Sequence, residues 1–167
     1  ADWKLDLDEL DDALTERTKL LVLNTPHNPT GKVFSNAELG EIARLAIAHD
    51  LLVVTDEVYE HMTYDATRHI PLATLPGMAE RTVTISSGGK SFGLTGWKVG
   101  WAHGPTELVN AVHTVKQHLS FTSGAPFQRA MVTALTLGDS YFTVLADDLC
   151  AKRDLVADGL RSVGLDV

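Results

Sequence analysis

Residues 20–55 contain Leu20-Leu21-Val22-Leu23, then Ser35-Asn36-Ala37-Glu38, and finally Leu51-Leu52-Val53-Val54-Thr55. The first and the last of these are short apolar runs, which are typical of strands buried inside a sheet. The middle one is a capping box, and the apolar residues that follow it have helical spacing: Leu39, Ile42, Ala43, Ala46 and Ile47. The order strand, helix, strand predicts two parallel strands joined by a right-handed crossover.

Further apolar patterns extend this unit in both directions. The runs Val83–Ile85 and Val99–Ala102 predict two more strands, and an amphipathic stretch, Leu5 to Leu14, precedes the first strand. The spacing over Leu108–Leu119 and Phe142–Leu160 predicts two helices, with a break at Thr122–Pro126. A final strand is expected to start at Gly164–Val167. The sequence therefore predicts an α/β fold, with a mostly parallel sheet and flanking helices.

Composition narrows the class of protein. The 167 residues are 44% apolar, enough for the core of one ordinary domain, and the formal net charge is −8. No Lys/Arg cluster is present, which argues against binding to nucleic acid or to an anionic membrane. The chain has no apolar run of roughly 18 residues and no signal-peptide pattern at Ala1–Lys4, so we expect a cytoplasmic protein. The single cysteine, Cys150, excludes an intramolecular disulfide, and we expect it to be a packed thiol.

Three polar clusters follow the predicted strands: Asn24–Gly31, Asp56–Tyr59 and Ser86–Phe92. Taken singly, they have ordinary explanations, namely a turn, a helix cap and a surface lysine after a glycine turn. Functional groups of open α/β sheets, however, gather at the carboxyl ends of the strands. The three clusters together bring a lysine, a carboxylate, a phenol and an amide to one crevice.

That set of groups suits pyridoxal phosphate (PLP) chemistry. A lysine amine must attack the cofactor aldehyde, a carboxylate must keep the pyridine nitrogen protonated, and hydrogen bonds must tune the ring oxygen. Histidines near the clusters, His27, His61 and His103, are not expected to be catalytic, because the lysine already supplies the base. Their spacing also predicts no metal site.

The segment Ser87-Gly88-Gly89-Lys90-Ser91-Phe92-Gly93-Leu94-Thr95-Gly96-Trp97-Lys98-Val99-Gly100 resembles the lysine signature of the fold-type-I PLP-dependent aminotransferases of classes I and II. The other two clusters stand in the order of that family, and the resemblance covers essentially the whole chain. It implies that residues 1–125 are part of the PLP-binding large domain. Residues 126–167 would then be interdomain helices and the start of a small C-terminal domain.

The resemblance also implies a role for each site residue. Lys90 would carry the cofactor as a Schiff base, the internal aldimine, and would later move the proton from the substrate Cα. Asp56 would pair with the pyridine nitrogen, and Tyr59 and Asn28 would hydrogen-bond the ring oxygen. The phosphate would be held by the last two site residues, Ser87 and Lys98. Around the Asn-Pro segment, Pro26 or Pro29 is a candidate cis proline.

Two positions depart from the common family pattern. Lys98 stands where most members have arginine, so a point charge replaces a bidentate fork, as in the kynurenine, glutamine-K, methionine and N-succinyldiaminopimelate aminotransferase branch. Gly88 stands where a small side chain such as alanine is commoner, and we expect it only to loosen the turn. The branch suggests 2-oxoglutarate as amino acceptor, with an amino acid as donor.

Family members are considerably longer than this chain, which is therefore expected to be an internal fragment. The parent would be a homodimer, and the fragment alone would be inactive and poorly soluble. Three alternatives remain open. The first, β-elimination from cysteine S-conjugates, would use the same Lys90; the second is a non-catalytic PLP-binding sensor module of a transcription regulator; the third is a structural or binding role for the fragment itself.

Overall fold

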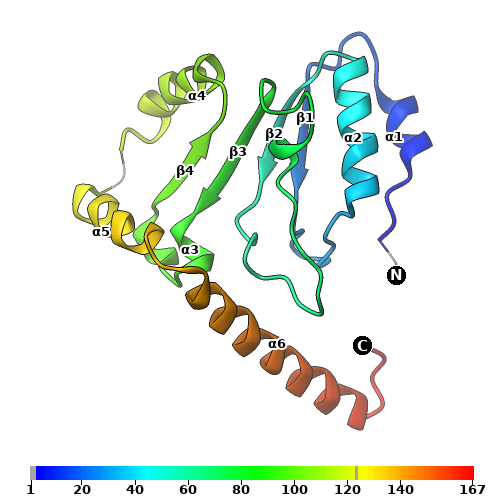
Figure 1. Cartoon of the computed structure of the whole chain (residues 1–167), viewed down its shortest axis with the longest axis vertical. Coiled ribbons are helices and arrows are strands. Elements are labelled where there is room, and N and C mark those ends of the chain that lie inside the picture. The colour runs from blue at the N-terminus through cyan, green and yellow to red at the C-terminus, as the bar shows by residue number, and fades with distance from the viewer. Residues whose placement is uncertain (1–2, 123) are drawn as a thin grey trace.

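The computed structural model describes residues 3–122 and 124–167 and contains one four-stranded sheet. Its strands are β1 (Leu20–Asn24), β2 (Leu52–Asp56), β3 (Thr82–Ser87) and β4 (Gly100–His103), in that spatial order (Figure 1). The first three strands are parallel, and β4 is antiparallel to β3. The α/β prediction is confirmed, and each predicted strand is found within two residues of its expected position.

Helices are found where the patterns over Leu39–Ile47, Leu108–Leu119 and Phe142–Leu160 predicted them and at the amphipathic stretch, whereas the helices Gly88–Ser91 and Ala125–Leu135 were not predicted. The helices are α1 (Leu7–Ala13), α2 (Asn36–Ala48), α3 (Gly88–Ser91), α4 (Thr106–Leu119), α5 (Ala125–Leu135) and α6 (Asp139–Ser162), with short 3-10 turns at Leu72–Thr74 and Thr95–Trp97. The expected strand at Gly164–Val167 is wrong, because α6 carries the end of the chain away from the sheet and leaves it no strand to pair with (Figure 1). Within the described ranges, no helix has the length and apolar character needed to cross a membrane.

Helix α2 begins at the predicted capping box. The Ser35 hydroxyl accepts a hydrogen bond from the Glu38 amide, and the Glu38 carboxylate accepts one from the Ser35 amide, at 3.2 and 2.8 Å. The Lys32 ammonium also contacts the Glu38 carboxylate. These bonds fix where the helix starts, and so they fix which of its residues face the sheet.

The core lies between α2 and one face of the sheet. Buried α2 residues, including Leu39 and Ile42, pack there with Leu23 and Val53 of the strands and with Leu72 and Met78 of the following loop. Because side chains alternate along a strand, the neighbouring residues point to the other face. On that face Leu20, Val22, Leu52 and Ile85 are exposed, Val22 to 67%. The sheet therefore has one covered face and one open face.

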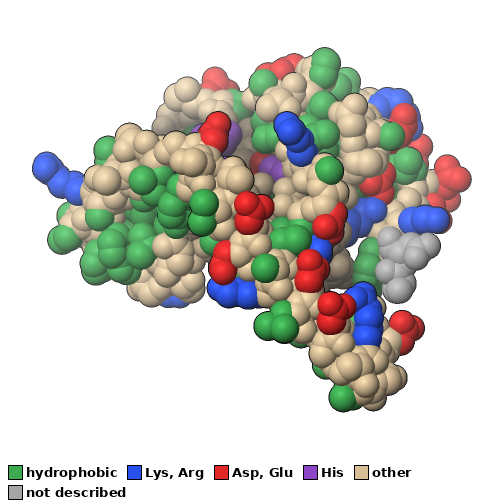
Figure 2. Space-filling view, turned by 60° about the horizontal axis from the view of Figure 1, so that its bottom comes forward, with side chains coloured by type: hydrophobic (Ala, Val, Ile, Leu, Met, Phe, Trp, Pro, Cys, Tyr) green, Lys and Arg blue, Asp and Glu red, His purple; other side chains and the backbone are tan. Residues whose placement is uncertain are grey.

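The helical half of the chain is more exposed than the sheet half. Met131 is the buried residue of α5, whereas Phe127, Val132 and Leu135 of the same helix are exposed. Figure 2 shows hydrophobic side chains gathered on the side of the molecule where α5 lies.

The thiol of Cys150 on α6 is partly exposed and lies 3.3 Å from the Arg153 guanidinium, so it is less completely packed than expected.

The cap of α2 predicts a measurable dependence of stability on pH. Burial alone would raise the pKa of the Glu38 carboxyl, but hydrogen bonds from Lys32 and Ser35 outweigh it and lower the pKa to about 2. A carboxyl with a depressed folded-state pKa stabilises the fold above its unfolded pKa and loses that contribution as the pH falls. The free energy of unfolding should therefore decrease between pH 4.5 and about 2. Chemical denaturation at several pH values should show a smaller decrease for Glu38→Gln than for wild type, and equal slopes would contradict the assignment.

Candidate active site

The carboxyl ends of β1 and β2 are tied together by an asparagine. Asn24 ends β1, and its side-chain amide donates a hydrogen bond to the backbone carbonyl of Asp56, at 3.0 Å. Its side-chain oxygen accepts one from the amide of Asn28, at 3.1 Å. The peptide bonds before Pro26 and Pro29 are both cis, so each candidate for a cis proline proves to be one. The segment that carries Asn28 is thus held against the end of β2.

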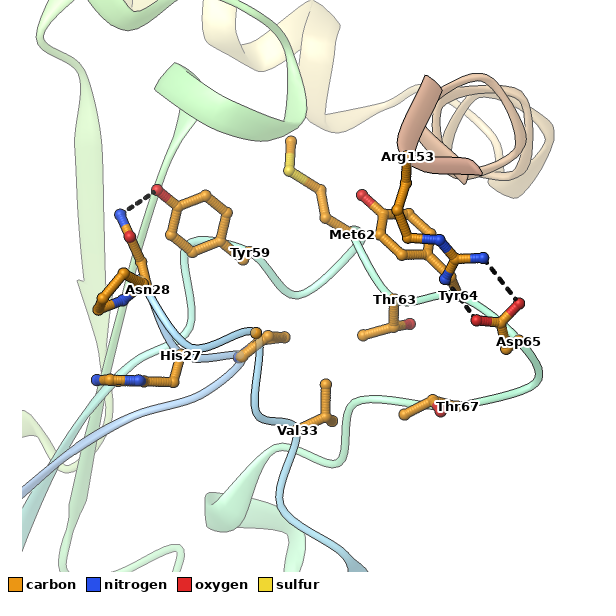
Figure 3. Close-up of a pocket in the computed structure, with 13 residues that line it drawn as sticks. His27, Asn28, Val33, Tyr59, Met62, Thr63, Tyr64, Asp65, Thr67 and Arg153 are labelled. Carbon is orange, nitrogen blue, oxygen red and sulfur yellow. Dashed lines mark hydrogen bonds and ion pairs between the residues drawn. The ribbon is translucent and has the colours of Figure 1, made fainter. Parts of the chain in front are cut away.

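Asn28, Tyr59 and Lys90 come together at this edge although they are far apart in the chain. The side-chain amide of Asn28 donates to the Tyr59 hydroxyl at 3.1 Å, as drawn in Figure 3. The Lys90 Nζ lies over the Tyr59 ring, 5.5 Å from its centroid. An amide, a phenol and an amine from the three predicted clusters therefore meet in one place.

Asp56 is the last residue of β2 and is half-buried on the open face of the sheet. It lies beside Ile85 in the register of β2 and β3. One of its carboxylate oxygens accepts a hydrogen bond from the Val58 amide at 3.2 Å, which begins the turn towards Tyr59. The hydrogen bond from the Val58 amide therefore orients the Asp56 carboxylate, which lies on the side of the sheet that α2 does not cover.

Ser87, Lys90 and Lys98 line a second part of the site. Ser87 caps α3, with its hydroxyl accepting a hydrogen bond from the Gly89 amide at 3.3 Å. Thr95 closes the segment after Lys90 by donating to the Gly89 carbonyl at 2.7 Å. A cavity of about 260 Å³ lies there, lined by Ser87, Gly89, Lys90, Leu94, Thr95, Lys98, Val99 and Gly100. Lys98 has a left-handed backbone conformation, with φ of 55°.

A larger cavity of about 660 Å³ begins at Asn28 and Tyr59 (Figure 3). At its far end Arg153 of α6 pairs with the Asp65 carboxylate through both terminal nitrogens and lies over the ring of Tyr64, 5.4 Å from its centroid. The hydrogen bond from Arg153 lowers the pKa of Asp65, and burial raises the pKa of the Tyr64 phenol. Tyr64 lines this cavity. Of the six predicted residues, Asn28 and Tyr59 line this cavity, three line the smaller one, and Asp56 lines neither.

The sequence did not predict that Arg153 lines this cavity. Arg153 is 88 residues from Asp65, and nothing in the local pattern of α6 distinguishes it from a solvated helix charge. The sequence also did not predict the contact of His69 with Glu57, two buried polar groups below the Asp56–Tyr59 turn, although a histidine and the acid of Asp56-Glu57 are both visible in the sequence.

Two of the three histidines named from the sequence have local side-chain partners. His27 Nδ1 lies 2.7 Å from the Thr30 hydroxyl, and His61 stacks on Phe142 of α6 with ring centroids 3.7 Å apart. Burial lowers the pKa of His61. Among residues 3–122 and 124–167, no three His, Cys, Asp or Glu side chains are grouped so as to hold a metal ion.

Gly88 has a packing role that the sequence did not predict. A Cβ atom at this position would lie 2.6 Å from Sδ and 2.7 Å from Cε of Met131, far closer than van der Waals contact. Gly88 is buried, and Met131 is the buried residue of α5. The glycine therefore makes room for Met131 immediately before the Lys90 segment, rather than only loosening a turn.

The fold and the site together define an α/β protein in which a lysine on a small-residue turn lies over a phenol that is hydrogen-bonded to a side-chain amide. The chain matches the aminotransferase class I and II family over residues 1–167, and it belongs to that family.

Two curated relatives illustrate the likeness. The probable N-succinyldiaminopimelate aminotransferase DapC of Mycobacterium tuberculosis is 53% identical over 165 residues, which are 99% of this chain and 42% of the relative. Human kynurenine–oxoglutarate transaminase 3 is 44% identical over 172 residues, with 99% and 38% covered. The chain thus spans about two fifths of the length of these relatives.

Solved structures show the same likeness. The structure of N-succinyldiaminopimelate aminotransferase from M. tuberculosis superposes with a TM-score of 0.93 at 53% identity, over 96% of this chain and 42% of that one. The structure of YbdL from Escherichia coli, described as having a methionine aminotransferase function, gives a TM-score of 0.90 at 34% identity, with 96% and 43% covered.

The contact between Gly88 and Met131 can be tested by a double-mutant cycle. Gly88→Ala should destabilise the fold by about 1 kcal/mol, because the added methyl group displaces the flexible end of the buried Met131 side chain. In a Met131→Ala background the same change should cost clearly less, since the added methyl group then enters vacated space. Denaturant unfolding of the four proteins measures this coupling. An equal effect of Gly88→Ala in both backgrounds would show that the two residues do not compete for space.

Proposed function

We propose that the protein of which this chain is part transfers an amino group between an amino acid and a 2-oxo acid, using PLP bound to Lys90. The observation that carries the proposal is the meeting of Asn28, Tyr59 and Lys90 at the carboxyl edge of a parallel sheet. Membership of the aminotransferase family supports the same reaction class.

The residues present fit the chemical groups of PLP. The Ser87 hydroxyl and the Lys98 ammonium share one cavity and suit a phosphate, which needs donors and positive charge. The Tyr59 hydroxyl and the Asn28 amide suit a ring oxygen, and the Asp56 carboxylate suits a protonated pyridine nitrogen.

When bound, PLP supplies an electron sink that makes the substrate Cα–H acidic. The residues of this chain would do the rest. Asp56 would keep positive charge at the pyridine nitrogen, and Tyr59 with Asn28 would stabilise negative charge on the ring oxygen. Lys90 would take the proton from the substrate Cα and return it to the cofactor side, because its flexible stem reaches across the Tyr59 ring. The larger cavity beyond Asn28 and Tyr59 offers room for a substrate side chain.

Substrates and assembly are proposed by analogy with the relatives. We take 2-oxoglutarate as the amino acceptor, by analogy with the kynurenine–oxoglutarate transaminase, and leave the donor to be identified by screening. Residues 1–125 would belong to the cofactor-binding domain, and residues 126–167 would lead into a small domain. The active form would be a cytoplasmic homodimer, and the 167-residue chain alone would be inactive.

The test uses the full-length protein mixed with PLP. An absorbance band should appear that is absent in Lys90→Ala, and borohydride should attach the cofactor to the peptide that contains Lys90, as mass spectrometry would show. Adding an amino acid donor should then convert that band to the one of the aminated cofactor, and 2-oxoglutarate should restore it.

The competing functions give different results in the same assay. Release of pyruvate from a cysteine S-conjugate without added 2-oxo acid would indicate β-elimination instead. A Lys90-dependent band that no amino acid converts would indicate a binding module without turnover. Absence of any Lys90-dependent band would overturn the proposal.

The proposed contact of Lys98 with the phosphate of PLP can be tested separately. Lys98→Ala should weaken PLP binding by about tenfold to a hundredfold, because a hydrogen bond to a charged group contributes on the order of 1.5–3 kcal/mol. Lys98→Arg should bind at least as tightly as wild type, since a guanidinium offers two parallel donors to a phosphate. Equilibrium dialysis of PLP measures both. Unchanged binding in Lys98→Ala would remove Lys98 from the phosphate site.

A further inference from the structure

A buried polar pair lies directly behind the predicted cofactor residues. The Glu57 carboxylate contacts the His69 imidazole, with Oε2 and Nε2 2.7 Å apart, and their side chains are only 1% and 5% exposed. The other oxygen, Oε1, accepts a hydrogen bond from the Thr55 hydroxyl at 2.8 Å. Thr55 in turn lies 3.2 Å from the hydroxyl of Thr84 on β3. The group forms a polar island on the covered face of the sheet.

Alternation along β2 places this island opposite the site. Asp56 points to the open face, and Glu57, one residue later, points to the covered face. The Glu57 amide extends the ladder to β3 by donating to the Ile85 carbonyl at 2.9 Å. The Glu57 carbonyl then accepts from the Glu60 amide at 2.9 Å, which closes the turn that contains Tyr59. Glu57 is therefore the fixed point between Asp56 and Tyr59.

The hydrogen bonds restrict how His69 is protonated. Nε2 faces the carboxylate, whereas Nδ1 is buried and has no hydrogen-bond partner in the described structure. A proton on Nδ1 would have no acceptor, so the pair is best satisfied when Nε2–H donates to the Glu57 carboxylate. The Nε2–H of His69 then holds one buried carboxylate in a single orientation.

We propose that His69 acts through Glu57 as a positioning residue for the reaction, fixing the Asp56–Tyr59 turn so that the carboxylate and the phenol face the cofactor. The inference rests on the proposed function, since it assigns a task to residues of that same site. His69 lies in the loop that leads from the Tyr59 turn to the turn at Leu72–Thr74. Its hydrogen bond thus anchors this loop to the end of β2.

The test compares three variants of the full-length protein. His69→Phe keeps a ring but removes the donor, and His69→Gln keeps an N–H that can reach Glu57. Ile42→Ala is the matched control, because it removes core volume from α2 without touching the Asp56–Tyr59 turn. Melting temperatures of His69→Phe and Ile42→Ala establish that both lose stability. Hydrogen exchange of residues 56–60 in the cofactor-free proteins reports whether the turn has loosened.

In His69→Phe, exchange at residues 56–60 should become faster. The pH at which the Lys90-dependent band changes should move upward by about one unit, because the ring oxygen loses stabilisation from Tyr59. The value of kcat should fall by about tenfold to a hundredfold, as expected when groups are misplaced by about 1 Å. His69→Gln should restore most of each property, and Ile42→Ala should leave the pH profile unchanged.

Each other outcome overturns the inference. If His69→Phe keeps the wild-type pH profile, or shifts it no more than Ile42→Ala does, the pair only stabilises the core. If His69→Gln is as impaired as His69→Phe, the hydrogen bond to Glu57 is not the cause. A wild-type protein with no Lys90-dependent band removes the proposed function itself, and that result is distinct because it is visible before any His69 variant is made.

Discussion

The parallel pairing of β1, β2 and β3 is the constraint on which the rest of the site depends. Their register sets Asn24 beside Asp56 and Asp56 beside Ile85, so the segments that follow the three strands leave the sheet at one edge. Tyr59 is 31 residues from Asn28 and 31 residues from Lys90, yet one hydrogen bond and one cation–π contact join the three. An antiparallel β1–β2 pair would have sent Asn28 and Tyr59 to opposite edges. The direction of the strands therefore decides which side chains can meet at this edge.

The two neighbouring residues at the end of β2, Asp56 and Glu57, have different roles. Asp56 points to the open face, where a ligand can reach it, and Glu57 points into the covered face, where it is buried with Thr55 and His69. A buried carboxylate is costly unless donors surround it, and here a hydroxyl and an imidazole supply them. The polar island therefore stabilises only the one arrangement in which both donors reach Glu57. An apolar residue at position 57 would pack as well but would not define the direction of the turn.

Local patterns were sufficient to predict most of the fold. Apolar runs located β1 to β4 because buried strands need continuous apolar residues, and the Ser35–Glu38 box located the start of α2 because it satisfies the first amides of a helix. The same strand order predicted that Asn28, Asp56, Tyr59 and Lys90 lie near one edge. Contacts between distant side chains could not be predicted in this way. The pairs Arg153–Asp65 and His69–Glu57 depend on where α6 and the loop after Tyr59 lie in space, and no periodicity encodes that.

The two departures from the family pattern affect opposite sides of the Lys90 segment. At Gly88 the missing side chain is compensated from outside, because Met131 of α5 occupies the space that a Cβ would need. At Lys98 the change is in charge geometry, since an ammonium on a left-handed residue replaces a planar fork. The first departure makes the Lys90 turn dependent on the packing of α5, a helix that is otherwise largely exposed. Met131 is therefore the α5 residue that packs against the glycine two positions before Lys90.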